Sequence, residues 1–106
     1  MKQVRPKKNL GQHFLTDLTI ARRIADTVDA CPDLPVLEVG PGMGVMTQYL
    51  TEKPRPIAVV EIDRESVEYL KATFSTRQFN IIKGDFLRMD LRSLFDGGQF
   101  VLTGNY

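Results

Sequence analysis

The chain has 106 residues, of which 42% are hydrophobic and 25% charged. These are ordinary globular proportions, which argue against a disordered chain and leave room for one small domain or part of a larger one. The purest apolar run, residues 57–60, is far too short to cross a bilayer, and a single cysteine, Cys31, excludes an internal disulfide framework and a cysteine-based zinc site. We therefore expect a cytoplasmic protein without a membrane span.

The net charge of +1 hides an uneven distribution of charged side chains. Four of the 14 basic residues and none of the 13 acidic ones lie in residues 1–16, so the arm is strongly basic and the remaining chain mildly acidic. A basic terminus is typical of a solvated tail, which charge alone favours, and also of a contact with nucleic-acid phosphates. We treat residues 1–15 as a basic N-terminal arm and residues 16–106 as the folded domain.

Helical periodicity marks the first element after the arm. Thr16 or Asp17 can cap a helix that runs to about Ala30, with apolar residues recurring three and four positions apart until Pro32 ends it. The sequence Val-Leu-Glu-Val at residues 36–39 predicts a short strand, because it is apolar, rich in β-branched residues and followed by glycines.

Helices and strands alternate through the rest of the sequence. In order, we expect a helix between the glycines of residues 40–44 and Pro54, a strand at 57–62, a helix at about 64–74, and strands at 79–82 and 100–103. Strands separated by helical crossovers form a parallel sheet with both faces covered. The pattern therefore predicts an α/β fold.

The fourth predicted strand lies at the very end of the sequence. Open α/β sheets bind ligands at the carboxyl ends of their strands, so a chain that stops at Tyr106 would divide such a site. We therefore expect part of a longer protein, truncated after the fourth strand. An exposed apolar edge at this strand would also favour pairing of two chains, which predicts a dimer.

The most specific local pattern is Glu-Val-Gly-Pro-Gly-Met-Gly at residues 38–44, between a predicted strand and a predicted helix. Glycine allows a sharp turn and lets a ligand approach the main chain. A dinucleotide fingerprint would need its third glycine at position 45 or 47, where Val45 and Thr47 stand. Glu38 would repel a pyrophosphate but attract a cationic amino-acid group, which favours S-adenosylmethionine over NAD. The alternative is an ordinary tight turn between strand and helix.

Acidic residues lie at the end of the next predicted strand and just after the one that follows it. Glu61 lies 21 residues after Gly40, where a carboxylate can accept hydrogen bonds from the two hydroxyls of an adenosine ribose. Asp63 is better explained as the cap of the helix that follows it. Asp85 could accept a hydrogen bond from the adenine amino group, with Phe86 near the ring. The alternative for Asp85 is a turn aspartate before a short helix.

Five motifs, in order and at matching spacing, resemble one family. They are Lys-Lys-Asn-Leu-Gly-Gln-His-Phe-Leu at residues 7–15, Glu-Val-Gly-Pro-Gly-Met-Gly at 38–44, Glu-Ile-Asp at 61–63, Gly-Asp at 84–85 and Gly-Asn-Tyr at 104–106. Together they resemble the KsgA-type rRNA adenine dimethyltransferases, and the first motif is much more particular to that family than the glycine loop. The resemblance covers nearly the whole chain.

The resemblance implies a Rossmann-like methyltransferase domain followed by a smaller helical domain. It implies dimethylation of N6 on two adjacent adenosines of small-subunit rRNA, with S-adenosylmethionine as the methyl donor, during ribosome biogenesis. Carried over by position, the cofactor-binding residues are His13, Leu15, Gly40, Gly42, Glu61, Asp85 and Asn105. His13 departs from the commonest bacterial pattern, which has asparagine, although either side chain can donate a hydrogen bond.

The family's catalytic motif is asparagine, a variable residue, proline and an aromatic residue, of which this chain has Asn105 and Tyr106. Asn105 would accept a hydrogen bond from the amino group of the target adenine in the RNA. The missing aromatic residue would stack on this extruded base. We therefore expect the isolated chain to be inactive.

Lys7 and Lys8 would contact RNA phosphates. The competing hypothesis is an RNA-binding or assembly module without a competent cofactor site.

Overall fold

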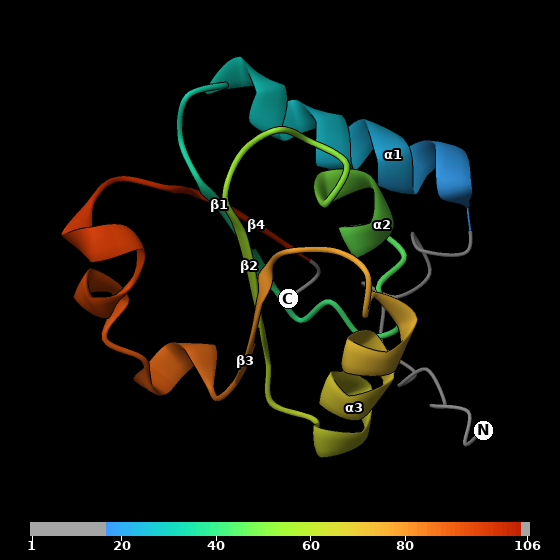
Figure 1. Cartoon of the computed structure of the whole chain (residues 1–106). Coiled ribbons are helices and arrows are strands. Elements are labelled where there is room, and N and C mark those ends of the chain that lie inside the picture. Colours follow the sequence, from blue (N-terminus) through green and yellow to red (C-terminus); the bar gives the residue numbers. More distant parts are fainter. Residues whose placement is uncertain (1–16, 105–106) are drawn as a thin grey trace.

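The computed structural model describes residues 17–104, and its centre is a parallel sheet of four strands in the order β3-β2-β1-β4 (Figure 1). The strands are β1 (Val36–Val39), β2 (Ile57–Glu61), β3 (Asn80–Lys83) and β4 (Val101–Gly104). The predicted α/β fold is confirmed. The chain returns across the sheet after β3 to place β4 beside β1, so the strand order reverses between these two strands.

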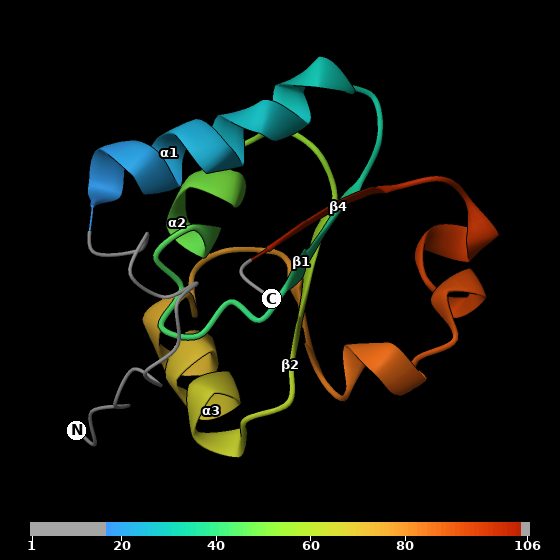
Figure 2. The same ribbon diagram turned by 180° about the vertical axis from the view of Figure 1, so that it is seen from behind.

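Helices cover one face of the sheet, and irregular turns cover the other (Figures 1 and 2). The helical face carries α1 (Leu18–Asp26), the 3₁₀ turn η2 (Thr27–Ala30), α2 (Thr47–Leu50) and α3 (Arg64–Thr73). The opposite face carries three 3₁₀ turns, η3 (Phe86–Arg88), η4 (Leu91–Ser93) and η5 (Phe95–Gly97). The crossover from β3 to β4 therefore covers its face without an α-helix.

Two-residue periodicity divides the buried side chains between these faces. On β1, Val36 packs with Met46 and Leu50 on the helical face, whereas Leu37 packs with Leu94 on the other. The even-numbered residues of β1 and the odd-numbered residues of β2 therefore face the helices, because Ile57 belongs to the first cluster and Ala58 to the second. By the same alternation, Glu38 of β1 and Glu61 of β2 lie on the helical side.

The helix termini follow the predicted capping. Asp17 accepts hydrogen bonds from the backbone N–H groups of Thr19 (2.9 Å) and Ile20 (3.3 Å) and so begins α1. The helix predicted to reach Ala30 does so with a tighter last turn, because α1 ends at Asp26 and η2 continues to Ala30. No helix within residues 17–104 is long and apolar enough to cross a membrane.

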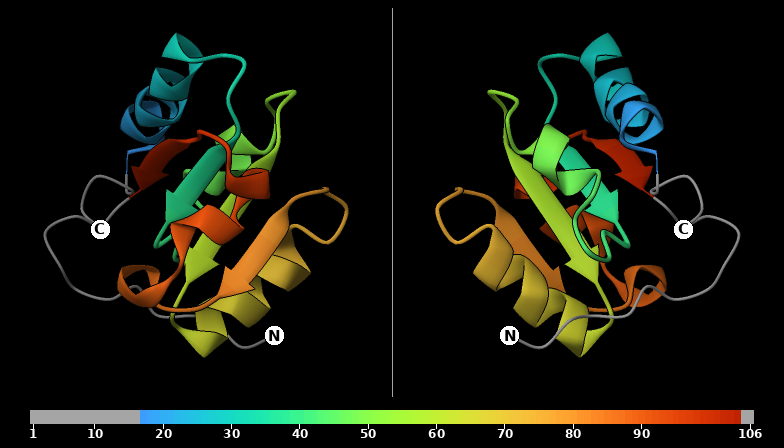
Figure 3. Two further views of the ribbon diagram at one scale, coloured as in Figure 1. Left: turned by 90° about the vertical axis from the view of Figure 1, so that its left-hand side faces the viewer. Right: turned by 90° about the vertical axis from the view of Figure 1, so that its right-hand side faces the viewer.

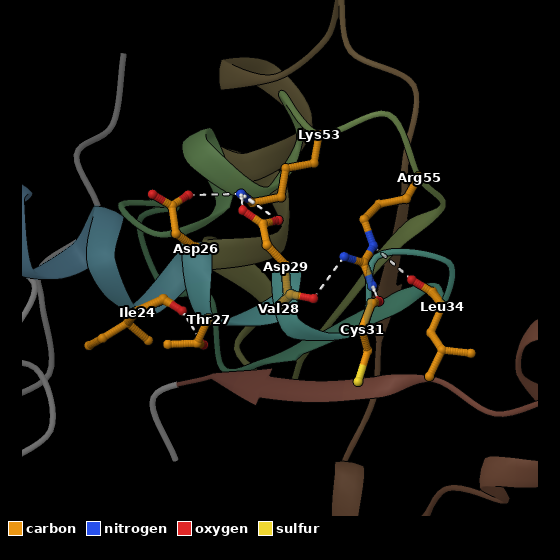
Figure 4. A network of polar contacts seen from close by, with 9 residues as sticks. All are labelled: Ile24, Asp26, Thr27, Val28, Asp29, Cys31, Leu34, Lys53 and Arg55. Atoms are coloured by element: carbon orange, nitrogen blue, oxygen red, sulfur yellow. Dashed lines mark hydrogen bonds and ion pairs between the residues drawn. The ribbon is translucent and has the colours of Figure 1, made fainter.

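A polar network fastens η2 to the start of β2, at the amino ends of the strands (Figure 4). The Arg55 guanidinium donates to the carbonyl oxygens of Leu34 (2.7 Å), Val28 (2.9 Å) and Cys31. Lys53 Nζ pairs with Asp26 (2.8 Å) and Asp29 (3.1 Å). Arg55 thus meets the carboxyl end of the helical segment, where carbonyl oxygens carry partial negative charge, whereas Lys53 pairs with two carboxylates.

Candidate functional site

The carboxyl ends of the four strands meet at one edge of the sheet. In the register, Val39 at the end of β1 is opposite Val60 and Gly104, and Glu61 is opposite Lys83. The arrowheads of all four strands point toward this edge in Figure 3. The glycine loop therefore lies at the same edge as Glu61, the last residue of β2, and Asp85, which follows β3, as the sequence predicted.

Positive φ angles explain the alternating glycines of the loop. Gly40, Gly42 and Gly44 have φ angles of 67°, 57° and 81°, a region that other L-residues rarely adopt. A Cβ atom on Gly44 would lie 2.5 Å from Cε2 of Phe74, so this glycine also allows α3 to pack against the loop. A Cβ atom on Gly42 would meet no atom within 4 Å. The loop thus packs on α3 at Gly44 and borders open space at Gly42.

Glu61 connects this loop to the start of α3. Its Oε1 accepts a hydrogen bond from the Gly42 backbone N–H, and its Oε2 accepts one from the Asp63 N–H, both at 3.0 Å. The Glu61 residue is 8% exposed. Asp63 in turn caps α3, accepting from the backbone N–H (2.9 Å) and hydroxyl (2.8 Å) of Ser66. The predicted capping role of Asp63 is therefore confirmed.

Asp85 lies next to Glu61 along the same edge. The backbone N–H of Gly84 donates to the Glu61 carbonyl oxygen (3.0 Å), which places the two acidic residues on neighbouring strands. Asp85 Oδ1 accepts from the Leu87 N–H (3.0 Å) and caps η3. The turn role is thus present, and the side chain stays 36% exposed. Phe86, expected near a bound ring, packs against the core cluster that includes Leu37.

Glu38 lies beneath the loop and away from its open side. It is 1% exposed and accepts a hydrogen bond from the hydroxyl of Thr47 in α2. Burial raises the pKa of Glu38 to about 7, and the negative charge of Glu61 adds to that rise, whereas the Thr47 hydrogen bond opposes it. The structure therefore does not support the sequence interpretation, in which Glu38 attracts a cationic group, because the carboxyl is enclosed and its raised pKa weakens its negative charge near neutral pH.

Two exposed hydrophobic residues, which the sequence pattern did not indicate, flank the acidic pair. Ile62 follows Glu61 and is 61% exposed, and Leu87 lies two positions after Asp85 and is 89% exposed. The sequence predicts that Ile62 belongs to the second strand, but β2 ends at Glu61. No sequence signal separates Ile62 from a buried strand residue, because its exposure depends on where β2 ends. Together they add apolar surface beside the two carboxylates.

The remaining predicted site residues lie outside the described residues. They are Lys7, Lys8, His13, Leu15 and Asn105. Their predicted contacts with cofactor and RNA stay predictions.

Residues 3–105 match the family model described as "Ribosomal RNA adenine dimethylase". The chain belongs to this family. The match covers nearly the whole sequence and confirms the resemblance found in its motifs. The glycine loop, Glu61 and Asp85 described above all fall within the matched part of this dimethylase family member.

Curated relatives of the chain carry the name "Ribosomal RNA small subunit methyltransferase A". The protein of Phocaeicola vulgatus is 64% identical over the full chain, and that of Bacteroides thetaiotaomicron is 62% identical. The chain covers 38% of the first and 40% of the second. It therefore spans about two fifths of the length of these relatives.

Solved structures show the same fold. The 23S rRNA methyltransferase ErmE is 33% identical with a TM-score of 0.69, over 86% of this chain and 36% of that one. The N-terminal domain of EvdMO1 with S-adenosylhomocysteine bound is 21% identical with a TM-score of 0.67, over 88% of this chain and 39% of that one, which concerns the fold alone. The dimethylase family member thus has the Rossmann-like fold of S-adenosylmethionine-dependent methyltransferases.

Proposed function

We propose that this chain is the cofactor-binding part of an rRNA adenine-N6,N6-dimethyltransferase and binds S-adenosylmethionine at the carboxyl edge of its sheet. The observation that carries the proposal is the meeting of the glycine loop, Glu61 and Asp85 at that edge. Strand order reverses beside this point, between β1 and β4, which is where open α/β sheets form their ligand crevice.

The residues present fit the parts of this cofactor. Gly42 leaves open space against which the amino-acid portion can lie. Glu61 accepts from the ribose hydroxyls, Asp85 accepts from the adenine amino group, and Ile62 offers its exposed side chain to the adenine ring. The bound cofactor supplies a methyl group on a positively charged sulfur. Gly40, His13, Leu15 and Asn105 complete the proposed contacts.

The substrate follows from the family and from the relatives' name, which refers to the small ribosomal subunit. The reaction is dimethylation of N6 on two adjacent adenosines of small-subunit rRNA, in the cytoplasm, during ribosome biogenesis. Asn105 accepts a hydrogen bond from the amino group of the target adenine in the RNA and so orients that nitrogen toward the methyl donor. Lys7 and Lys8, in the basic arm of residues 1–15, contact RNA phosphates.

The isolated 106-residue chain is not expected to methylate RNA, because the family motif that begins at Asn105 continues with a proline and an aromatic residue beyond Tyr106. Measurable dimethylation of small-subunit particles by this chain would contradict that expectation.

Pairing of two chains through β4 also stays a prediction. It is consistent with the position of β4 at the sheet edge and with a Leu102 side chain that is 40% exposed. Sedimentation as a monomer at high concentration would contradict it.

Calorimetric titration with S-adenosylhomocysteine, with NAD as the control ligand, tests the cofactor proposal. We expect binding of the first ligand only, and at least tenfold weaker binding by Glu61→Gln, because one carboxylate oxygen is replaced by an N–H donor. Glu68→Gln is the matched control, since Glu68 is 66% exposed on α3 and pairs with Arg64. Equal affinity of the wild-type chain and Glu61→Gln would contradict the assigned role.

The basic arm favours a second candidate function, an RNA-binding or assembly module that needs no cofactor. Four basic and no acidic residues in positions 1–16 are the specific observation. Neutralising Lys7 and Lys8 to alanine should weaken RNA binding and flatten its dependence on salt, because fewer counterions are released. An unchanged salt slope would contradict a phosphate contact at these two positions. RNA binding without any affinity for S-adenosylhomocysteine would favour the module over the enzyme.

A further inference from the structure

The hydrogen bonds of Glu61 suggest a task beyond contact with a ribose. Each carboxylate oxygen already accepts a backbone N–H, Oε1 from Gly42 and Oε2 from Asp63, at 3.0 Å in both cases. Gly42 is 19 residues earlier in the sequence, in the middle of the glycine loop, whereas Asp63 begins α3. Glu61 therefore joins two segments that border the proposed cofactor site.

The middle of the loop depends on this side chain more than its ends do. The Gly40 N–H donates to the Val60 carbonyl oxygen (3.0 Å), and the Gly44 N–H donates to that of Pro41 (2.9 Å), so main-chain bonds hold both ends. Gly42 has a φ of 57°, and a Cβ atom there would meet nothing within 4 Å. Because that side of Gly42 borders open space, packing does little to hold this residue in place. The hydrogen bond to Glu61 is the contact that ties it to a distant part of the chain.

We infer that Glu61 is also a positioning residue, which holds the glycine loop in its cofactor-binding conformation before the cofactor arrives. This inference rests on the proposed cofactor site. A carboxylate has about four lone-pair positions, and the two backbone donors use two of them. The other two can accept ribose hydroxyls while the loop stays held. Bonds from N–H groups to a charged acceptor are stronger than neutral ones, which suits this role in a half-open loop.

Glu61 would then contribute to cofactor affinity in two ways. One is the direct contact of Glu61 with the ribose hydroxyls, which a ligand without those hydroxyls cannot make. The other is the prearranged loop, from which any ligand lying against Gly42 benefits, because the loop has already been ordered. Removing the carboxylate should therefore weaken binding even of a ligand that has no ribose hydroxyls.

Amide hydrogen exchange in the cofactor-free chain tests whether Glu61 holds the glycine loop before the cofactor binds. In the wild-type chain the Gly42 amide should be protected. In Glu61→Met, which removes both acceptor oxygens and keeps an unbranched side chain, Gly42 should exchange roughly tenfold faster or more. Glu68→Met is the matched control and should leave Gly42 unchanged. A Gly42 amide that is unprotected in the wild type, or equally protected in Glu61→Met, would overturn the inference.

Folding of the variant is checked by its amide spectrum. If Glu61→Met does not fold, scalar coupling through the hydrogen bond between the Gly42 nitrogen and the Glu61 carboxyl carbon, measured in the wild-type chain, decides in its place. Observed coupling supports the inference, and its absence overturns it.

The effect of the prearranged loop on affinity is tested with two ligands, S-adenosylhomocysteine and its 2′,3′-dideoxy analogue. We expect Glu61→Met to bind the analogue roughly tenfold more weakly than the wild type does. Equal affinity for the analogue would leave Glu61 as a ribose contact alone and would overturn the positioning role. If the wild-type chain binds neither ligand, the proposed function fails, and the exchange of Gly42 still decides whether Glu61 holds the loop.

Discussion

At the scale of single residues, the environment of Glu38 decides its charge. Burial raises its pKa from 4.5 to about 7, so the folded chain holds a proton there at pH values where the unfolded chain has released it. The sequence identified Glu38 as an acidic residue before the loop but could not show its enclosure, which depends on α2 folding back over β1. The Thr47 hydrogen bond records that contact.

The pH dependence of unfolding tests this description of Glu38. Because the pKa of the folded state is the higher one, the contribution of Glu38 to stability is fullest below about pH 4.5 and is lost as the pH rises through about 7. Glu38→Gln keeps an acceptor for Thr47. Its free energy of unfolding, relative to that of the wild type, should therefore rise by up to about 3 kcal/mol between pH 5 and 8. Urea denaturation measures this difference. Parallel profiles for the two chains would contradict the buried, protonatable state.

The glycines of the loop give a second prediction at this scale. Gly44→Ala should lower the free energy of unfolding by about 3 kcal/mol, because its Cβ meets the Phe74 ring and its φ is 81°. Gly42→Ala should lower it by only about 1–2 kcal/mol, because it has the unfavourable φ of 57° without the clash. Urea unfolding of the two variants gives the comparison, and an equal loss of stability would show that packing on α3 does not distinguish them.

At the scale of elements, the order and type of the main helices and strands were predictable, because hydrophobic periodicity and capping residues act locally. The strand at residues 36–39 was predicted with its observed bounds, and Asp17 and Asp63 cap the helices as expected. The boundaries of β3 and β4 lie one residue later than predicted, at 80–83 and 101–104. The loop of residues 40–46 leaves α2 only one turn, Thr47–Leu50.

The connection between η2 and β2 gives a prediction for a pair of elements. Arg55→Met should destabilise the chain by about 2–3 kcal/mol, because three carbonyl oxygens, those of Val28, Cys31 and Leu34, lose their shared donor. Arg64→Met should change stability by less than about 1 kcal/mol, because Arg64 is 79% exposed and makes a surface ion pair. Thermal unfolding of both variants tests the contrast. Equal effects would show that the Arg55 network does not fasten these elements.

At the scale of the whole molecule, the sequence predicted where the site lies better than how it is built. A parallel sheet brings its carboxyl ends together, so the glycine loop, Glu61 and Asp85 had to be neighbours. The bond between Glu61 and Gly42 and the exposure of Ile62 depend on side-chain orientation, which a one-dimensional pattern does not contain. Cover on the second face was expected, and Asp85 suggested a short helix after it, but η4 and η5 were not predicted, because short 3₁₀ turns have no periodic signal.

If S-adenosylmethionine binds at the carboxyl edge of the sheet, the amides of that edge should respond to the ligand. Amide chemical-shift mapping with S-adenosylhomocysteine tests it most directly, because each region of the chain reports separately. We predict that the shifts concentrate at Gly42, Ile62 and Leu87, and that the groove at the opposite end, lined in part by Lys53 and Arg55, stays unchanged. Shifts centred on that groove, or no shifts at a saturating concentration, would contradict cofactor binding at the carboxyl edge.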